Sequence, residues 1–200
     1  MRRFAAGDRI TGHSLLDAFG KLVAVPDASR VTHLQFRRFA GCPVCNLHLR
    51  SFARRIGEIE DAGLQEVAVF HSTAREMRRY EADLPFAVIG DAEKKLYREF
   101  GVEAASRALT DPRVYGAILK AVAVTTVETI ARRKLLANAN PHGGRFGLPG
   151  DFLIAPSGRI IACKYGEHAD DQWSVDEVLA LARGVCQSPT VRTKGEQPLP

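Results

Sequence analysis

Two cysteines stand two residues apart in the segment AGCPVC, residues 40–45. This C-x-x-C spacing lets two thiols close a disulfide or share a metal ion. The motif falls between a predicted strand and a predicted helix, where unpaired N–H groups and the positive helix end stabilise a thiolate. A stabilised thiolate is nucleophilic at neutral pH. We therefore expect Cys42 and Cys45 to be a redox-active pair, with Arg37 and Arg38 upstream as sources of positive potential.

Three other interpretations of the pair are zinc binding, covalent haem attachment and inert thiols. A zinc site needs four ligands, so His48 would need a fourth partner such as Cys163 or Cys186, and a second C-x-x-C is absent. Covalent haem would need histidine directly after the second cysteine, where Asn46 stands. Two buried, inert thiols are the third reading. We favour the redox pair without metal or cofactor, and expect Cys163 and Cys186 to be bystanders.

The elements around the motif are a strand and an amphipathic helix. Residues 31–36 are rich in β-branched and apolar side chains, as in a central strand. Pro43 suits the first turn of a helix, and Gly63 is a stop signal. Between them, one apolar face has spacings of 3, 4 and 3, formed by Leu49, Phe52, Ile56 and Ile59. The pattern predicts one helix that begins at the cysteines.

Strands and helices then alternate. The predicted strands are 66–70 and 86–89, and the predicted helices are 73–83 and 91–100, the last with Asp91 as its cap. Together with an earlier short strand at 20–26, this alternation is typical of an α/β sheet with helices packed on it.

The second half of the chain adds an insertion and a hairpin. Residues 103–147 break the alternation with a long helical stretch, which we interpret as an insertion because about 45 residues make a poor independent core. A β-hairpin at 151–165 follows, and then a helix over 174–183 that begins with a Ser174–Glu177 capping box. We expect a single domain over 1–186 and a disordered tail over 187–200.

Composition limits the function classes. The 200 residues are 46% hydrophobic and 26% charged, the balance of a soluble globular chain, and four cysteines are too few for a disulfide scaffold. The net charge of +5 is scattered in short arginine groups, which does not indicate a nucleic-acid partner. The N-terminal apolar run is too short for a signal peptide, and the stretch 117–127 is too short to span a membrane. We expect a cytoplasmic protein with no membrane or nucleic-acid partner.

Four segments together resemble a known family. They are THLQFRRFAGCPVC, LPFAVIGDAEKKLYREFGV, GLPGDFLIAPSGRII and YGEHADDQWSVDEVLAL. Their order and spacing resemble the thioredoxin-fold superfamily and, within it, the peroxiredoxin-like proteins of the alkyl hydroperoxide reductase/thiol-specific antioxidant group. The resemblance covers about residues 5–102 and 147–184. It implies a thioredoxin-like α/β fold, with a central mixed sheet flanked by helices and a helical insertion before the last hairpin.

The resemblance offers two registers for the cysteines. In thioredoxin-type oxidoreductases the first cysteine attacks and the second resolves, which implies Cys42 as the nucleophile. In the peroxiredoxin register, Cys45 takes the peroxidatic position, Cys42 the threonine position and Arg38 the proline position. The flanking segments favour the peroxiredoxin register, and hence Cys45. The arginine of that family would fall near Gly150, and no arginine stands there.

Two prolines are implied to support the site. Pro43 lies inside the motif. Pro149 matches the superfamily's proline that packs beside the cysteines after a cis peptide bond; the alternative is an ordinary proline that opens a strand.

The expected function is a thiol-dependent oxidoreductase of peroxiredoxin-like type. Cys42 and Cys45 would cycle between dithiol and disulfide while reducing a peroxide or a disulfide. The expected electron donor is a thiol reductant such as thioredoxin or glutathione, and the resemblance is compatible with a homodimer. The alternative is a non-catalytic thioredoxin-fold binding or scaffold module, which the missing threonine and arginine would favour.

Overall fold

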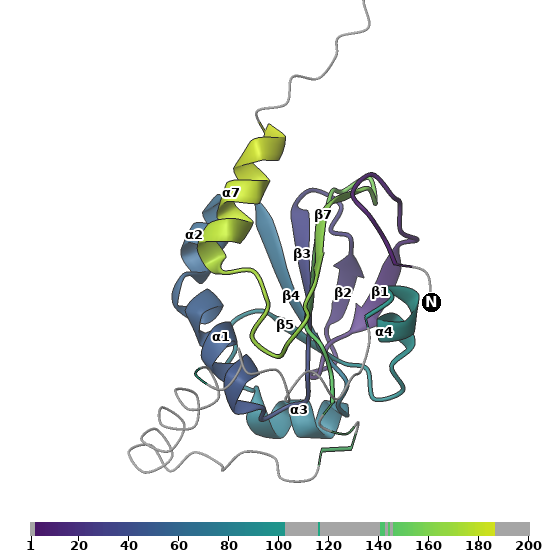
Figure 1. Cartoon of the computed structure of the whole chain (residues 1–200), viewed down its shortest axis with the longest axis vertical. Coiled ribbons are helices and arrows are strands. Elements are labelled where there is room, and N and C mark those ends of the chain that lie inside the picture. The colour runs from purple at the N-terminus through teal and green to yellow at the C-terminus, as the bar shows by residue number, and fades with distance from the viewer. Residues whose placement is uncertain (1–2, 103–115, 117–140, 143, 145, 187–200) are drawn as a thin grey trace, which may run out of the picture.

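The computed structural model describes residues 3–102, 116, 141–142, 144 and 146–186 (Figure 1). Apart from Gly116, the predicted insertion helix lies outside the described residues, as does the predicted tail at 187–200.

A mixed sheet runs through the centre of the protein. The described residues form it from five strands in the order β5-β4-β3-β6-β7. The strands are β3 (Val31–Arg37), β4 (Leu64–Phe70), β5 (Ala87–Gly90), β6 (Gly150–Ile154) and β7 (Ile160–Tyr165). β3, β4 and β5 are parallel, whereas β6 is antiparallel to β3 and pairs with β7 in the predicted hairpin. The predicted α/β class and mixed central sheet are confirmed.

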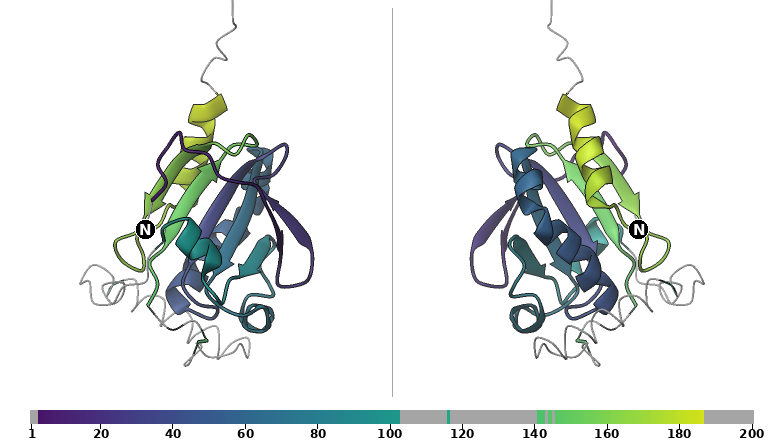
Figure 2. Two further views of the ribbon diagram at one scale, coloured as in Figure 1. Left: turned by 90° about the vertical axis from the view of Figure 1, so that its right-hand side faces the viewer. Right: turned by 90° about the vertical axis from the view of Figure 1, so that its left-hand side faces the viewer.

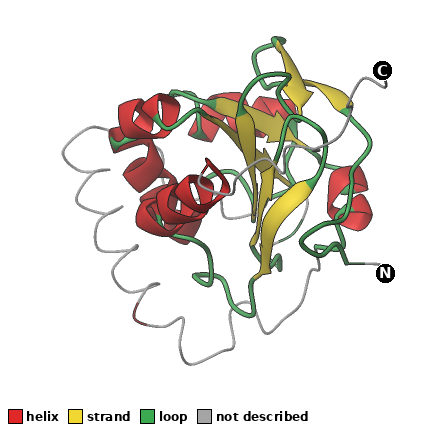
Figure 3. Ribbon diagram, turned by 90° about the horizontal axis from the view of Figure 1, so that it is seen from above, coloured by secondary structure: helices red, strands yellow, loops and turns green. Residues whose placement is uncertain are grey.

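Helices cover both faces of this sheet. One face carries α1 (Pro43–Arg54), α2 (Ile56–Asp61) and α7 (Val175–Cys186), as Figure 1 and the right-hand view of Figure 2 show. The other face carries α4 (Lys95–Glu99) and an antiparallel ribbon of β1 (His13–Leu16) and β2 (Leu22–Val25). Seen from above, helices lie on both sides of the strands (Figure 3). No helix in the described part is long and apolar enough to cross a membrane.

α3 (Ala74–Tyr80) lies at the end of the sheet where β3 leads into α1 (Figure 1). Thr73 caps it, because its hydroxyl accepts the N–H of Glu76 while the Glu76 side chain accepts the N–H of Thr73. This reciprocal pair is a capping box. The local sequence therefore fixes where α3 begins.

The predicted single helix over the Leu49–Ile59 face is two helices. The backbone leaves helical geometry at Arg55, where φ is −115° and ψ is 22°, and the Arg55 N–H bonds to the Phe52 carbonyl. This tighter turn separates α1 from α2. Phe52 and Ile59 are nevertheless both fully buried, so the apolar spacing identified the right face but could not reveal the break.

α4 begins later than predicted. Its N-cap is Lys94, with a left-handed φ of 56°, and not Asp91. The Asp91 carboxylate still accepts the N–H groups of Lys95, Leu96 and Tyr97. Asp91 thus performs the predicted capping from outside the helix.

Candidate functional site

Both cysteines lie where β3 gives way to α1. Cys42 is the N-cap residue of α1 in an extended conformation, Pro43 is the first helical residue, and Cys45 stands in the first turn. Both thiols are reduced in this structure. The predicted strand–motif–helix arrangement is therefore present, and it directs the positive end of α1 at the Cys42 sulfur.

The loop before Cys42 is held by α3 and by the end of β4. Gly41 has a left-handed φ of +79°, and a Cβ atom there would lie 2.8 Å from the Tyr80 ring. The Gly41 N–H donates to the Glu81 carboxylate at 2.8 Å, and the Ala40 N–H donates to the Ser72 hydroxyl at 3.0 Å. These contacts fix the path of the chain immediately before the first thiol.

The two thiols have opposite acidities. The Cys45 thiol donates a hydrogen bond to the Cys42 sulfur, and this bond is the main reason that the pKa of Cys42 falls to about 6. Burial opposes the fall, while the Arg38 charge and the N–H groups of Cys45 and Val44 add to it. The same shared hydrogen bond, together with burial, raises the pKa of Cys45 well above its ordinary value. The pair therefore carries its negative charge on Cys42 and its proton on Cys45.

Arg38 is the cation of the site. Its Nη1 lies 3.4 Å from the Cys42 sulfur, and its side chain is 3% exposed and lies over the Phe39 ring at 5.3 Å. The sequence raised Arg38 as a source of positive potential but could not give its direction. The structure also shows that no arginine in the peroxiredoxin register is needed to bring a guanidinium to these thiols.

Arg37 points the other way, into a buried polar network beneath α1. It donates to Asp151 at 2.7 Å and to His48 at 3.2 Å. His33 continues the network, with Nδ1 2.9 Å and Nε2 3.4 Å from the carboxylates of Glu66 and Asp151 respectively. The sequence did not predict this network, because polar side chains that alternate along a strand ordinarily indicate a solvent-facing side.

Charges in the network are balanced by pairing. Burial lowers the pKa of His33, but Glu66 and Asp151 outweigh it and raise that pKa to about 9. Burial likewise raises the pKa of Asp151, but Arg37 and His33 outweigh it and hold it well below its usual range. Two cations and two anions thus share one desolvated site.

His48 does not support the interpretation of the cysteine pair as a zinc site. Its ring nitrogen accepts from Arg37, and burial, with Arg37 next, lowers its pKa and keeps it neutral. Across the residues that the structure describes, no group of three or more histidine, cysteine, aspartate and glutamate side chains could hold a metal ion.

Two further candidates are Pro149 and Cys163. The peptide bond before Pro149 is trans, since the cis bond of the described chain is Val25–Pro26, so the expected cis geometry is wrong. Pro149 opens β6, where its missing N–H costs no ladder bond, and its carbonyl accepts from Gly166. Cys163 is half-buried on β7, and its thiol donates to the Phe4 carbonyl at 3.3 Å.

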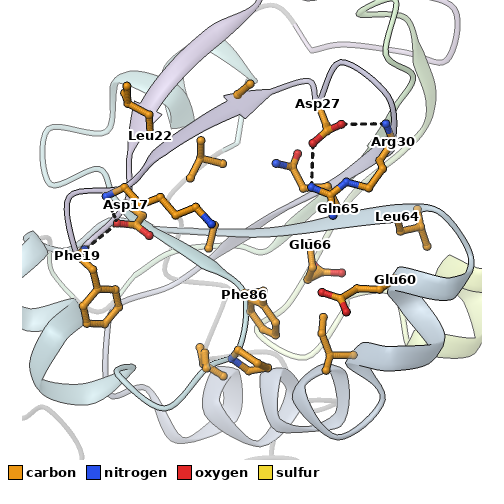
Figure 4. A pocket seen from close by; sticks show the side chains of 17 residues that line it. Asp17, Phe19, Leu22, Asp27, Arg30, Glu60, Leu64, Gln65, Glu66 and Phe86 are labelled. Atoms are coloured by element: carbon orange, nitrogen blue, oxygen red, sulfur yellow. Dashed lines mark hydrogen bonds and ion pairs between the residues drawn. The ribbon is translucent and has the colours of Figure 1, made fainter.

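A separate groove of about 470 Å³ lies beside the first residues of β4 (Figure 4). Its lining includes Leu64, Gln65 and Glu66, and Asp27 forms an ion pair with Arg30 at its rim. No cysteine lines it. β3 runs parallel to β4, and the thiols come after the end of β3, whereas the groove lies beside the start of β4. The groove is therefore not part of the thiol site.

Comparison with known proteins identifies a family. A family model described as "AhpC/TSA antioxidant enzyme" matches residues 51–168, more than half of the chain. The match begins after both cysteines, so it does not assign their roles. No curated protein matches the chain by sequence.

Solved structures share the fold. Peroxidoxin BcpB from Mycobacterium tuberculosis matches with a TM-score of 0.64 and 16% identity, covering 92% of this chain and 99% of that one. A cysteine-to-serine mutant of PrxQ from Xylella fastidiosa matches with a TM-score of 0.66 and 13% identity, covering 94% and 100%. AhpC from Mycobacterium bovis matches with a TM-score of 0.63 and 14% identity, covering 98% and 100%.

Proposed function

The chain belongs to the AhpC/TSA antioxidant enzyme family and is a thiol-dependent oxidoreductase, and from this premise we propose that Cys42 and Cys45 are its redox pair. The observation that carries the proposal is the arrangement of three groups: Arg38 beside the Cys42 sulfur, and the Cys45 thiol donating to that sulfur. The alternative of a non-catalytic binding module is not favoured by family membership.

Cys42 is the nucleophile in this proposal. It has the lowered pKa, the N-cap position and the arginine, whereas the pKa of Cys45 is raised. Only a thiolate attacks a peroxide or a disulfide. The electrostatics thus support the thioredoxin-type register over the peroxiredoxin register, which would select Cys45.

The peroxide-reducing half of the proposed reaction uses the two thiols and one further proton, which the departing alkoxide takes up. The Cys42 thiolate attacks one peroxide oxygen, the O–O bond breaks, and the departing alkoxide takes a proton to become an alcohol. Cys42 is then a sulfenic acid. The Cys45 sulfur attacks the Cys42 sulfur, the S–O bond breaks, and water leaves with the Cys45 proton. A thiol reductant returns two electrons and two protons to the disulfide.

Burial supports a small substrate. Cys42 is 1% exposed and Cys45 is 2% exposed. A hydroperoxide needs only a narrow path to the sulfur, whereas a disulfide of a folded protein needs an open thiol. Disulfide exchange stays the second candidate, because an N-cap cysteine with a partner in the next turn is also the arrangement which that reaction uses.

Peroxide consumption tests the proposal. Wild type should consume hydrogen peroxide and form a Cys42–Cys45 disulfide, and Cys42→Ser and Cys45→Ser should both lose turnover, while the matched control Cys163→Ser keeps it. Insulin reduction, measured in parallel, separates the two candidate substrates. If neither substrate is turned over and no intramolecular disulfide forms under oxidant, the proposal is wrong.

The reductant, compartment and assembly extend the proposal. A dithiol that must be regenerated fits a reducing compartment such as the cytoplasm, with thioredoxin or glutathione as donor. A homodimer is compatible with the family. Coupled assays with each donor, and sedimentation of the reduced and oxidised protein, test these points.

A further inference from the structure

Glu81 is a buried carboxyl group that the reaction above does not use. It follows α3 directly, is 1% exposed, and accepts the Gly41 N–H at 2.8 Å. Gly41 is the residue before the proposed nucleophile. Among the described residues, no lysine, arginine or histidine lies within ion-pair distance of this carboxylate. An ionised carboxylate in such a place lacks the counter-ion that buried charges require.

Burial and the charged groups around Glu81 together raise the pKa of its carboxyl group. Burial is the largest influence and raises its pKa to about 8; the Gly41 N–H opposes the rise, the Cys42 and Asp83 charges add to it, and Arg50 opposes it. Arg50 lies in α1 and is 3.8 Å from Asp83, which is 57% exposed. Arg38 lies against the Cys42 sulfur. Of the negative charges around Glu81, the Cys42 thiolate therefore has the largest effect on its pKa.

Two acids that resist being charged together thus lie close to one apolar cluster, Cys42 inside it and Glu81 directly after Tyr80, which packs against it. The cluster also contains Cys45, Ala40 and Phe39. While Cys42 is a thiolate, a second negative charge at Glu81 is unfavourable. Once the sulfur atoms form a disulfide, the thiolate charge is gone and that repulsion ends.

We propose that Glu81 is the proton reservoir of the dithiol, protonated while Cys42 is a thiolate and ionised once the disulfide has formed. This rests on Cys42 and Cys45 being the redox pair. Reducing a hydroperoxide to alcohol and water takes two electrons and two protons. The two sulfur atoms supply both electrons. The Cys45 thiol supplies one proton and the Glu81 carboxyl supplies the other, so the buried negative charge passes from sulfur to carboxylate.

Proton counting tests the proposal. In a single turnover with hydrogen peroxide at pH 7, in weak buffer with a pH indicator, wild type should take up close to no protons from solvent. Glu81→Gln keeps a carbonyl that can accept the Gly41 N–H but carries no proton to release, so it should take up about one proton per disulfide. Glu60→Gln, at an exposed position on α2, should behave as wild type.

The disulfide is counted separately by mass in the same samples. If wild type forms no disulfide, the assignment of the redox pair fails, whatever the proton count. If wild type forms the disulfide and takes up one proton, as Glu81→Gln does, the reservoir role fails. Should Glu81→Gln not fold, the infrared difference spectrum of wild type decides: the protonated-carboxyl band must disappear on oxidation, and its persistence overturns the proposal.

Discussion

Reactivity at the residue scale depends on how one proton is divided between two sulfur atoms. Arg38 and the N-terminus of α1 both lie beside Cys42, so both favour the thiolate on Cys42 and leave the proton on Cys45. Adjacent arginines in the sequence therefore have different tasks, since Arg37 pairs with Asp151 in the buried network. Arg37 is the last residue of β3 and Arg38 is the first residue of the loop that leads to α1, and their side chains reach different partners.

Removing the Arg38 charge should weaken Cys42 as an acid. Arg38→Met keeps most of the buried volume and deletes the cation 3.4 Å from the sulfur. We expect alkylation by iodoacetamide at pH 6.5 to fall about threefold, the loss of thiolate expected from a tenfold weaker acid. Arg54→Met, at an exposed position late in α1, is the control. An unchanged pH profile in Arg38→Met contradicts the role of Arg38.

Gly41 should not tolerate a side chain. Gly41→Ala meets a left-handed φ of +79° and places a Cβ atom 2.8 Å from the Tyr80 ring. We expect a loss of about 2 kcal/mol in the free energy of unfolding, measured with urea, and slower alkylation of Cys42. Gly57→Ala in α2 meets no atom within 4 Å and should cause no loss. Equal effects of the two substitutions would argue against a constrained loop.

The element that positions the site, besides β3 and α1, is α3. It supplies Tyr80 and leads into Glu81, the two residues that hold Gly41. Sequence patterns located each of these elements, because apolar periodicity and capping residues are local signals. They could not show that α3 fixes the cysteine loop, since that depends on contacts about 40 residues apart in the chain.

The capping box of α3 should therefore influence the thiols from a distance. Thr73→Ala removes the hydroxyl that accepts the Glu76 N–H and should cost about 1 kcal/mol of stability. It should also change the rate of Cys42 alkylation, because the end of α3 holds the loop. Ser174→Ala, in the equivalent box of α7, should cost about the same stability and leave alkylation unchanged. Stopped-flow alkylation and urea unfolding measure both.

The whole molecule is a sheet whose α1 face is partly polar inside. His33, Arg37, Glu66 and Asp151 are all fully or nearly fully buried there. The sequence predicted a buried central strand at 31–36, and the structure confirms it. The network itself was not predictable, because polar side chains alternating on a strand ordinarily indicate a solvent-facing side. The network can be buried only because helices cover it and because the carboxylates of Glu66 on β4 and Asp151 on β6 balance the cations on β3.

This network should make stability depend on pH. The pKa of His33 is raised to about 9 in the folded protein from about 6.5 when unfolded. Its contribution is therefore fully present below about pH 6.5 and is lost as pH rises through about 9. The stability difference between wild type and His33→Gln, from urea unfolding, should shrink by about 3 kcal/mol between pH 6 and pH 10. A difference that does not vary with pH would mean that His33 is neutral.

Cys42 is the proposed nucleophile of the thiol pair, and its first oxidation product can be located directly. The most direct measurement exposes Cys42→Ser and Cys45→Ser to hydrogen peroxide at pH 7 with a sulfenic-acid trap and locates the adduct by mass spectrometry. We expect rapid trapping at Cys42 in the Cys45→Ser protein and little at Cys45 in the Cys42→Ser protein. Faster trapping at Cys45 would contradict this assignment and restore the peroxiredoxin register.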